Sequence, residues 1–342
     1  MGQDPSIHWY KSPLDRQRLK ELTTKSDLKA FTRLSLHLLF SIATGVATYL
    51  SFLYLPWPVT ILALFIHGTF YNFLGMFTGI HELAHMTAFK SKGLNEFFYA
   101  ILGVLTWNNT YKFRASHQTH HRVTVYKGFD LEVILPEKFR LIDWFFMFTI
   151  NPTSGAGGVP GIFSMVWETV RYAFARFDGE WENMLFPKSE VKARRRIFWF
   201  ARITLIFHLL TAAWFILSGN WILVLVVNLG CFVAPWLATL CALPQHIGLS
   251  ANVPDWRLNS RTMILNPFVR FFYWNMNYHV EHHMYAGVPF YNLPQLHREI
   301  RDDCPEPSRG LLRTWGTLLP IIKRQQKEPD FVVIPVLPAV GE

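Results

Sequence analysis

The chain has 342 residues, of which 51% are hydrophobic and 16% aromatic, while only 17% are charged. Because soluble domains carry about 25% charged residues, this composition favours one integral membrane protein over two soluble domains. The formal net charge of +9 indicates attraction to an anionic membrane surface rather than nucleic-acid binding. Three cysteines provide no disulfide framework.

The first 30 residues are polar and of mixed charge, so no signal peptide is apparent and segment 13–22 is expected to form a surface helix. Two stretches almost free of charge follow. Residues 34–89 contain one acid, Glu82, and no Lys or Arg, and residues 203–254 contain no charged residue. Each stretch is long enough for two spans of about 20 residues. Turns at 54–59 and 217–221 divide them into two hairpins, with four spans at approximately 34–54, 59–80, 203–217 and 221–243.

All 33 Lys and Arg lie outside these hairpins. Since basic residues favour the cytoplasmic side, both termini and the segments 86–200 and 246–342 are predicted to be cytoplasmic. Apolar segments 96–107, 139–150 and 161–177 are too short to span and are predicted to lie at the membrane surface. The predicted fold is an all-α integral membrane protein, a single domain over 1–342, with four transmembrane helices and a cytoplasmic helical cap that carries a dinuclear metal site.

Nine of the 14 histidines form a pattern. In HELAH and in each of the two HxxHH copies, the histidines project from about one helical turn. The segment PQHIG adds one further histidine directly after the last predicted span. The predicted topology brings all nine to the cytoplasmic face, although the chain crosses the membrane between groups. The nine candidate metal ligands are His81, His85, His117, His120, His121, His246, His279, His282 and His283.

Imidazole binds iron, copper, nickel and zinc, so the ligand type alone does not select the metal. HELAH also fits the HExxH motif of zinc hydrolases, with Glu82 as general base, which makes an intramembrane metalloprotease an alternative. Catalytic zinc takes three protein ligands, however, and would leave about six histidines unused. Nine ligands instead suit two metal ions, and we favour two iron ions because dinuclear iron activates O₂ towards unreactive C–H bonds. A metal transporter would need histidines across the bilayer, whereas these lie at one surface.

The order HELAH, HQTHH, HVEHH resembles the membrane-bound fatty acid desaturase superfamily, the histidine-box integral-membrane diiron oxidases, over roughly residues 34–296. The resemblance implies O₂ as co-substrate, a fatty acyl or lipid substrate and electrons from an external protein. His246 occupies the place of a further imidazole found in the family. Ala242 stands where acyl-CoA desaturases have an Asn that binds through water, so Gln245 is a candidate substitute.

Neither end carries an HPGG haem motif, so the expected electron donor is a separate protein of the ferredoxin, rubredoxin or cytochrome b5 type. Desaturation is the expected reaction. Fatty acid hydroxylation and oxidative decarboxylation stay open, because substrate placement decides between these outcomes. The absence of a fused domain or retrieval signal favours the bacterial inner membrane over the endoplasmic reticulum.

Histidines that bind metals usually donate their other N–H to a carboxylate or carbonyl group. Polar residues close to the histidine motifs in sequence are therefore candidates for supporting hydrogen bonds. They are Glu82, Glu281, Asn277, Asp130, Asp255, Arg114 and Gln245.

Overall fold

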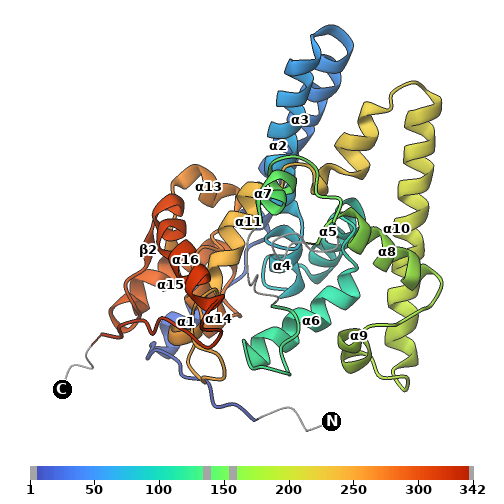
Figure 1. Cartoon of the computed structure of the whole chain (residues 1–342). Helices are drawn as coiled ribbons and strands as arrows, with labels where there is room; N and C mark the ends of the chain where they lie inside the picture. Colours follow the sequence, from blue (N-terminus) through green and yellow to red (C-terminus); the bar gives the residue numbers. More distant parts are fainter. Residues whose placement is uncertain (1–5, 134–139, 154–159, 339–342) are drawn as a thin grey trace.

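The computed structural model describes residues 6–133, 140–153 and 160–338. Within these ranges the regular secondary structure is helical apart from one short parallel pair of strands, β1 (Met263–Ile264) and β2 (Ser308–Arg309), and an isolated bridge between Ile150 and Val233. Three stretches are long and apolar enough to cross a membrane: Asp27–Tyr54, Trp57–Ala84 and Val191–Leu217. Shorter helices around these stretches form the remainder of the fold (Figure 1).

The first two membrane stretches form a hairpin. Helix α2 (Asp27–Tyr54) begins at Ser26, whose hydroxyl accepts a hydrogen bond from the Lys29 amide, and its 28 residues extend about 42 Å. Helix α3 (Trp57–Tyr71) starts after Pro56 and is followed by a 3-10 turn, η1 (Asn72–Leu74), and by α4 (Gly79–Ala84). The predicted spans 34–54 and 59–80 thus correspond to α2 and to the α3–η1–α4 segment.

Helix α10 (Val191–Leu217) contains the predicted third span and extends it by three turns at its basic N-terminal end. The predicted fourth span, 221–243, differs from expectation: among the described residues three membrane-spanning candidates are found, and this segment is not one of them. It consists of a π turn η2 (Val224–Asn228), a 3-10 turn η3 (Gly230–Phe232) and α11 (Trp236–Ala242).

The broken backbone of this segment is supported by side chains from neighbouring parts of the chain. The Trp107 indole donates to the Asn228 carbonyl oxygen at 2.7 Å, and the side-chain amide of Asn72 donates to the Val233 carbonyl oxygen at 2.7 Å. A ring nitrogen of His67 lies 3.1 Å from the Val226 carbonyl oxygen. Irregular backbone is tolerated at membrane depth when protein groups satisfy it. The absence of charged residues from segment 221–243 therefore reflects its burial and does not indicate a continuous helix.

Helices α2, α3 and the end of α10 project on one side, and the shorter helices gather on the other (Figure 1). The three segments expected at the membrane surface are helices α5 (Lys92–Leu105), α7 (Leu141–Phe148) and α8 (Ile162–Ala173). The remaining elements are α1 (Arg16–Leu22), α6 (Thr110–Val123), α9 (Glu180–Leu185), η4 (Leu243–Gln245), α12 (Trp256–Asn259), α13 (Pro267–Phe272), α14 (His279–Met284), η5 (Phe290–Asn292), α15 (Leu293–Ile300), η6 (Arg301–Asp303) and α16 (Leu311–Gln325).

Residues 8–14, here called the N-terminal strap, cross the outer ends of α6 and α14. The indole of Trp9 stacks on Trp256 with ring centroids 4.4 Å apart and donates to the Arg122 carbonyl oxygen at 3.0 Å. The Ser12 amide donates to the Met284 sulfur at 3.0 Å. The strap therefore fastens the ends of the two helices that carry the HxxHH motifs.

Candidate metal centre

The nine histidines, which lie up to 202 positions apart in the chain, converge at one place in the fold. Their ligand atoms form two groups, and within each group these atoms lie within 4.8 Å of one another. The five-histidine cluster contains His81, His85, His117, His121 and His282. The four-histidine cluster contains His120, His246, His279 and His283.

Each HxxHH helix supplies both clusters. Side chains at i and i+4 lie about 40° apart around a helix, whereas i+3 lies about 100° from i+4. On α6, His117 and His121 accordingly enter the five-histidine cluster and His120 enters the other. The arrangement is reversed on α14, where the i and i+4 histidines enter the four-histidine cluster and His282 joins the five. The motif spacing thus builds two adjacent centres from one pair of helices.

In the five-histidine cluster the inner ring nitrogens are closely spaced. The Nε2 atom of His117 lies 2.9 Å from that of His85 and 3.2 Å from that of His121, and the His121 and His282 Nε2 atoms are 3.1 Å apart. Two nitrogens that bind one metal at about 2.1 Å, with an angle of 90–110° between them, are separated by about 3.0–3.4 Å. The spacing therefore fits a shared metal ion.

The four-histidine cluster has the same spacing. The His279 Nε2 atom lies 3.0 Å from both the His246 and His283 Nε2 atoms, and the His120 and His283 Nε2 atoms are 3.3 Å apart. The Nδ1 atom of His246 lies 2.8 Å from the backbone carbonyl oxygen of Asn259, which can only accept a hydrogen bond. The Nε2 lone pair of a neutral His246 ring is therefore directed into the cluster, as metal binding requires.

Several outer nitrogens have the partners that orient metal-binding imidazoles. The His120 Nδ1 atom donates to Asp130 Oδ2 at 2.8 Å, and the His81 Nδ1 atom lies 3.0 Å from Glu82 Oε1. The structure therefore brings Asp130 and Glu82, two of the candidate supporting residues, against ligand-type histidines. The Nδ1 atoms of three histidines are buried without a hydrogen-bond partner in the described parts of the chain: His121, His279 and His282.

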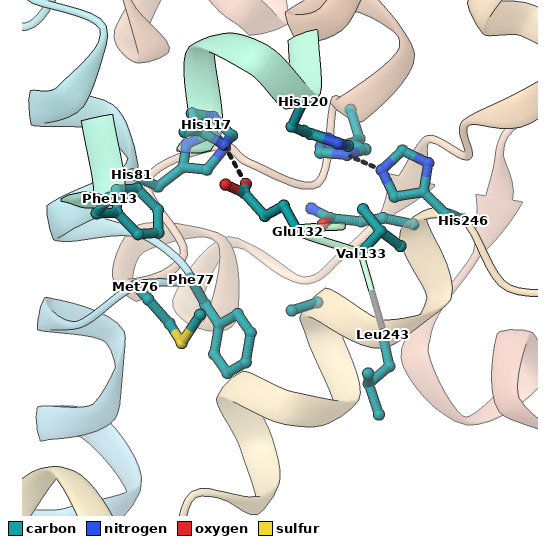
Figure 2. A pocket seen from close by; sticks show the side chains of 13 residues that line it. Met76, Phe77, His81, Phe113, His117, His120, Glu132, Val133, Leu243 and His246 are labelled. Carbon is teal, nitrogen blue, oxygen red and sulfur yellow. Dashed lines mark hydrogen bonds and ion pairs between the residues drawn. The ribbon is translucent and has the colours of Figure 1, made fainter. Parts of the chain in front are cut away.

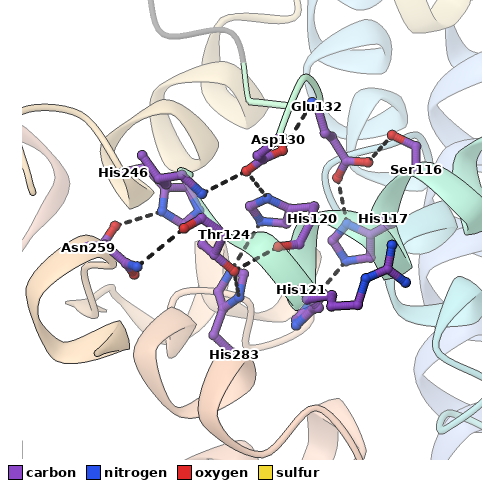
Figure 3. Close-up of polar contacts among 12 residues, drawn as sticks. Ser116, His117, His120, His121, Thr124, Asp130, Glu132, His246, Asn259 and His283 are labelled. Carbon is purple, nitrogen blue, oxygen red and sulfur yellow. Dashed lines mark hydrogen bonds and ion pairs between the residues drawn. The ribbon is translucent and has the colours of Figure 1, made fainter. Parts of the chain in front are cut away.

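Glu132 is a functional candidate that the sequence reasoning missed. Its Oε1 atom accepts from His117 Nδ1 at 2.6 Å and its Oε2 atom accepts from the Ser116 hydroxyl (Figure 3). The Ser116 hydroxyl in turn accepts from the Trp181 indole at 2.9 Å. A hydrogen-bonded chain thus connects α9, which carries Trp181, with the five-histidine cluster. The signal available in the sequence was an acid in the apolar stretch "FDLEVIL", two residues after the predicted Asp130.

Burial shifts the protonation equilibria of the centre. It lowers the pKa of His117 and His282 well below the ordinary value, which favours the neutral rings that metals bind. Burial also raises the pKa of Glu132 to about 7. For His120, burial opposes the charged form, but the charge and hydrogen bond of Asp130 outweigh burial and raise the pKa above its ordinary value. A metal ion at His120 therefore competes with a proton.

Five other candidate supporting residues have partners other than the nine histidines. Glu281 accepts from the Thr262 hydroxyl and contacts the His297 ring, and Asp255 forms an ion pair with Arg257. Arg114 pairs with Glu96.

The amide of Asn277 donates to the Met263 carbonyl oxygen at 2.7 Å, and that of Gln245 to the Tyr273 hydroxyl at 2.6 Å. These contacts differ from the predicted hydrogen bonds to the histidines. Gln245 nevertheless lines a cavity that adjoins the histidines.

A cavity of about 120 Å³ adjoins both clusters. Histidines and Glu132 form one end of it, and apolar side chains form the other end (Figure 2). The apolar lining includes Met76, Phe77, Phe113, Val133, Ala242 and Leu243. The cavity can therefore hold a short apolar segment beside the histidines.

The fold and the site define a helical membrane protein with a buried, histidine-rich centre suited to metal ions. The fatty acid desaturase family model matches residues 55–315, so the chain belongs to the fatty acid desaturase family. A search of curated proteins found no match. Membership makes the protein an oxidoreductase of the desaturase and hydroxylase type with a fatty acyl or lipid substrate.

Proposed function

We propose that the protein is an O₂-dependent oxidase that holds two non-haem iron ions and desaturates a fatty acyl chain. The observation that carries this proposal is the division of the nine histidines into a cluster of five and a cluster of four. Either cluster has enough imidazoles for one ion, and together they account for all nine. Oxidation of an unactivated C–H bond by O₂ is the chemistry that a pair of irons supplies when bound.

The protein's own residues position the two partners of this reaction. The five-histidine and four-histidine clusters would each hold one ion, and Asp130, Glu82 and Glu132 fix ring orientations from outside. The aromatic and aliphatic cavity wall excludes water and holds an acyl segment against the histidine end. Positioning of this kind is a large contribution to catalysis, because a misplacement of 1 Å can cost about 10²-fold in rate.

The alternatives within this chemistry are a fatty acid hydroxylase and an oxidative decarboxylase, which would use the same centre and differ in product. Nothing in the structure or the family match supports the zinc-protease alternative. The HELAH histidines His81 and His85 lie in a cluster with three further imidazoles, whereas a catalytic zinc takes three protein ligands in all.

The proposal includes the placement of the protein in the cell. Residues 1–342 form one membrane-embedded domain, with both termini and the histidine clusters on the cytoplasmic side, because basic residues favour that side. A separate donor of the ferredoxin, rubredoxin or cytochrome b5 type supplies electrons. The bacterial inner membrane is favoured over the endoplasmic reticulum.

The test combines metal analysis of the purified protein with mass spectrometry of lipids from cells that express it. We expect about two irons per chain and acyl chains lighter by two hydrogens. The variants His117→Ala and His282→Ala should lose product, while His8→Ala, at an exposed histidine, should retain it. A gain of one oxygen identifies a hydroxylase, and a loss of the carboxyl carbon identifies a decarboxylase. One zinc per chain, with activity retained in both cluster variants, contradicts the diiron proposal.

A further inference from the structure

A second depression, separate from the metal cavity, lies between the start of α6 and the N-terminal half of α10. Its volume is about 470 Å³, and it shares no lining residue with the cavity beside the histidines. Tyr111 of α6 contributes one wall, and α10 contributes the other with Lys192, Arg195, Arg196, Trp199 and Ile203. We call this depression the α10 groove.

The residues of α10 that line the groove form one stripe along the helix. Positions 192, 195, 196, 199, 200 and 203 are spaced i, i+3, i+4, i+7, i+8 and i+11, which places them on the same face. The stripe changes from cationic to aromatic to aliphatic along the helix. It continues towards the C-terminal end with exposed Ile206, Leu210 and Trp214.

This order matches the order of chemical groups in one leaflet of a bilayer. Lys192 and Trp199 are seven residues apart, about 10 Å along the helix axis. The polar headgroup layer on each side of the hydrocarbon core is about 5–8 Å thick, and Trp and Tyr concentrate at its boundary. With Trp199 and Tyr111 at that boundary, the basic side chains lie at the depth of lipid phosphates and Ile203 lies among acyl chains.

The three basic residues of the groove are free to bind an anion. In the described residues, no hydrogen bond or ion pair engages the side chains of Lys192, Arg195 or Arg196, and no acidic side chain lines the groove. Neighbouring bases on the same helix are engaged: Arg194 donates to the Phe186 carbonyl oxygen, and Arg202 donates to the Ala173 carbonyl oxygen. The cationic side chains of this helix segment whose N–H groups have no partner in the described residues are therefore concentrated on the groove.

We propose that the α10 groove binds one anionic phospholipid, with its phosphate against Arg195, Arg196 and Lys192 and an acyl chain along Trp199 and Ile203. The charge of the groove selects an anion, and its apolar half selects an amphiphile over a soluble phosphate. This site is separate from the metal centre, so a result that contradicts the diiron proposal does not contradict the lipid-site proposal.

The test is native mass spectrometry of the detergent-solubilised protein titrated with phosphatidylglycerol or phosphatidylcholine. The groove variant carries Lys192→Gln, Arg195→Gln and Arg196→Gln. The control variant removes the same number of charges through Arg16→Gln, Lys20→Gln and Arg298→Gln, at exposed positions on α1 and α15.

We expect the first phosphatidylglycerol to bind the groove variant roughly a hundredfold more weakly than wild type, since each basic residue near a lipid headgroup contributes about fivefold. The control variant should bind like wild type, and Trp199→Gln, which keeps every charge, should also weaken binding. Equal losses in both triple variants would overturn the proposal. So would displacement of the lipid by inorganic phosphate at micromolar concentration, because that result identifies a site for soluble anions.

Discussion

Replacement of Asp130 by asparagine isolates the contribution of one carboxylate to one half of the metal centre. The Asp130 carboxylate is nearly fully buried, and three N–H groups point at it: its Oδ2 atom accepts from His120 Nδ1 and the Val125 amide, both at 2.8 Å, and its Oδ1 atom accepts from the Glu132 amide at 3.1 Å. An amide group presents N–H where the carboxylate presents oxygen. Asp130→Asn therefore leaves at least one buried donor without an acceptor.

The expected magnitude follows from the role of the carboxylate in orienting His120. Mutation of such a supporting residue, which here removes the negative charge beside His120, costs about 10–100-fold in metal affinity, or about 1.4–2.7 kcal/mol. Only the four-histidine cluster contains His120, so one of the two metal equivalents should weaken and the other should bind as in wild type. Anaerobic titration of the metal-free protein with Fe(II), in competition with a chromophoric chelator, separates the two equivalents.

Asp255→Asn is the matched control. Asp255 caps α12 and pairs with Arg257 at 2.9 Å, and asparagine is as good a capping residue as aspartate. Both equivalents should bind normally in this variant. Wild-type affinity in Asp130→Asn, or the same weakening in both variants, would refute the assignment of Asp130 to the four-histidine cluster.

Three further predictions test other parts of the structure. His246→Ala removes one ligand from the four-histidine cluster and none from the other, so metal analysis should find about one tightly bound ion per chain instead of two. Ala242→Leu adds bulk to the cavity wall and should lower product formation by about 10²-fold or shift the oxidised position, with metal content unchanged, as measured by lipid mass spectrometry. Gly68→Ala would place a methyl group 2.4 Å from the Val233 carbonyl oxygen and should destabilise the protein by about 1–3 kcal/mol. Gly93→Ala, with no atom closer than 3.9 Å, should leave the thermal midpoint unchanged or raise it.

The sequence predicted the convergence of the nine histidines well because motif spacing is a local property. A helical turn determines which face His117, His120 and His121 share, and an uncharged stretch places each motif relative to the membrane. The division into five and four follows from the same geometry, although it becomes visible only when α6 and α14 face each other.

The supporting residues were harder to predict because they depend on contacts between distant segments. Asp255 is nine residues from His246 and pairs with Arg257, whereas Glu132 is eleven residues from His121 and reaches His117. In irregular segments the chain changes direction at every residue, so closeness to a histidine in the sequence does not predict contact with it. The fourth predicted span is not confirmed for a related reason, since hydropathy measures how apolar a segment is and not whether its backbone continues as a helix.

The N-terminal strap has a practical consequence for editing the ends of this chain. Trp9 contacts Arg122 near the C-terminal end of α6, and Ser12 contacts Met284 at the end of α14. The residues that precede the first membrane helix therefore hold the two histidine-bearing helices together. A truncation that begins at Asp27 would keep every span and all nine clustered imidazoles and would still expose Trp256 and Met284 to solvent. We expect such a shortened protein to insert into the membrane but to bind its metals more weakly than the full chain. Increased protease cleavage at α14 would show that this helix is no longer held in place.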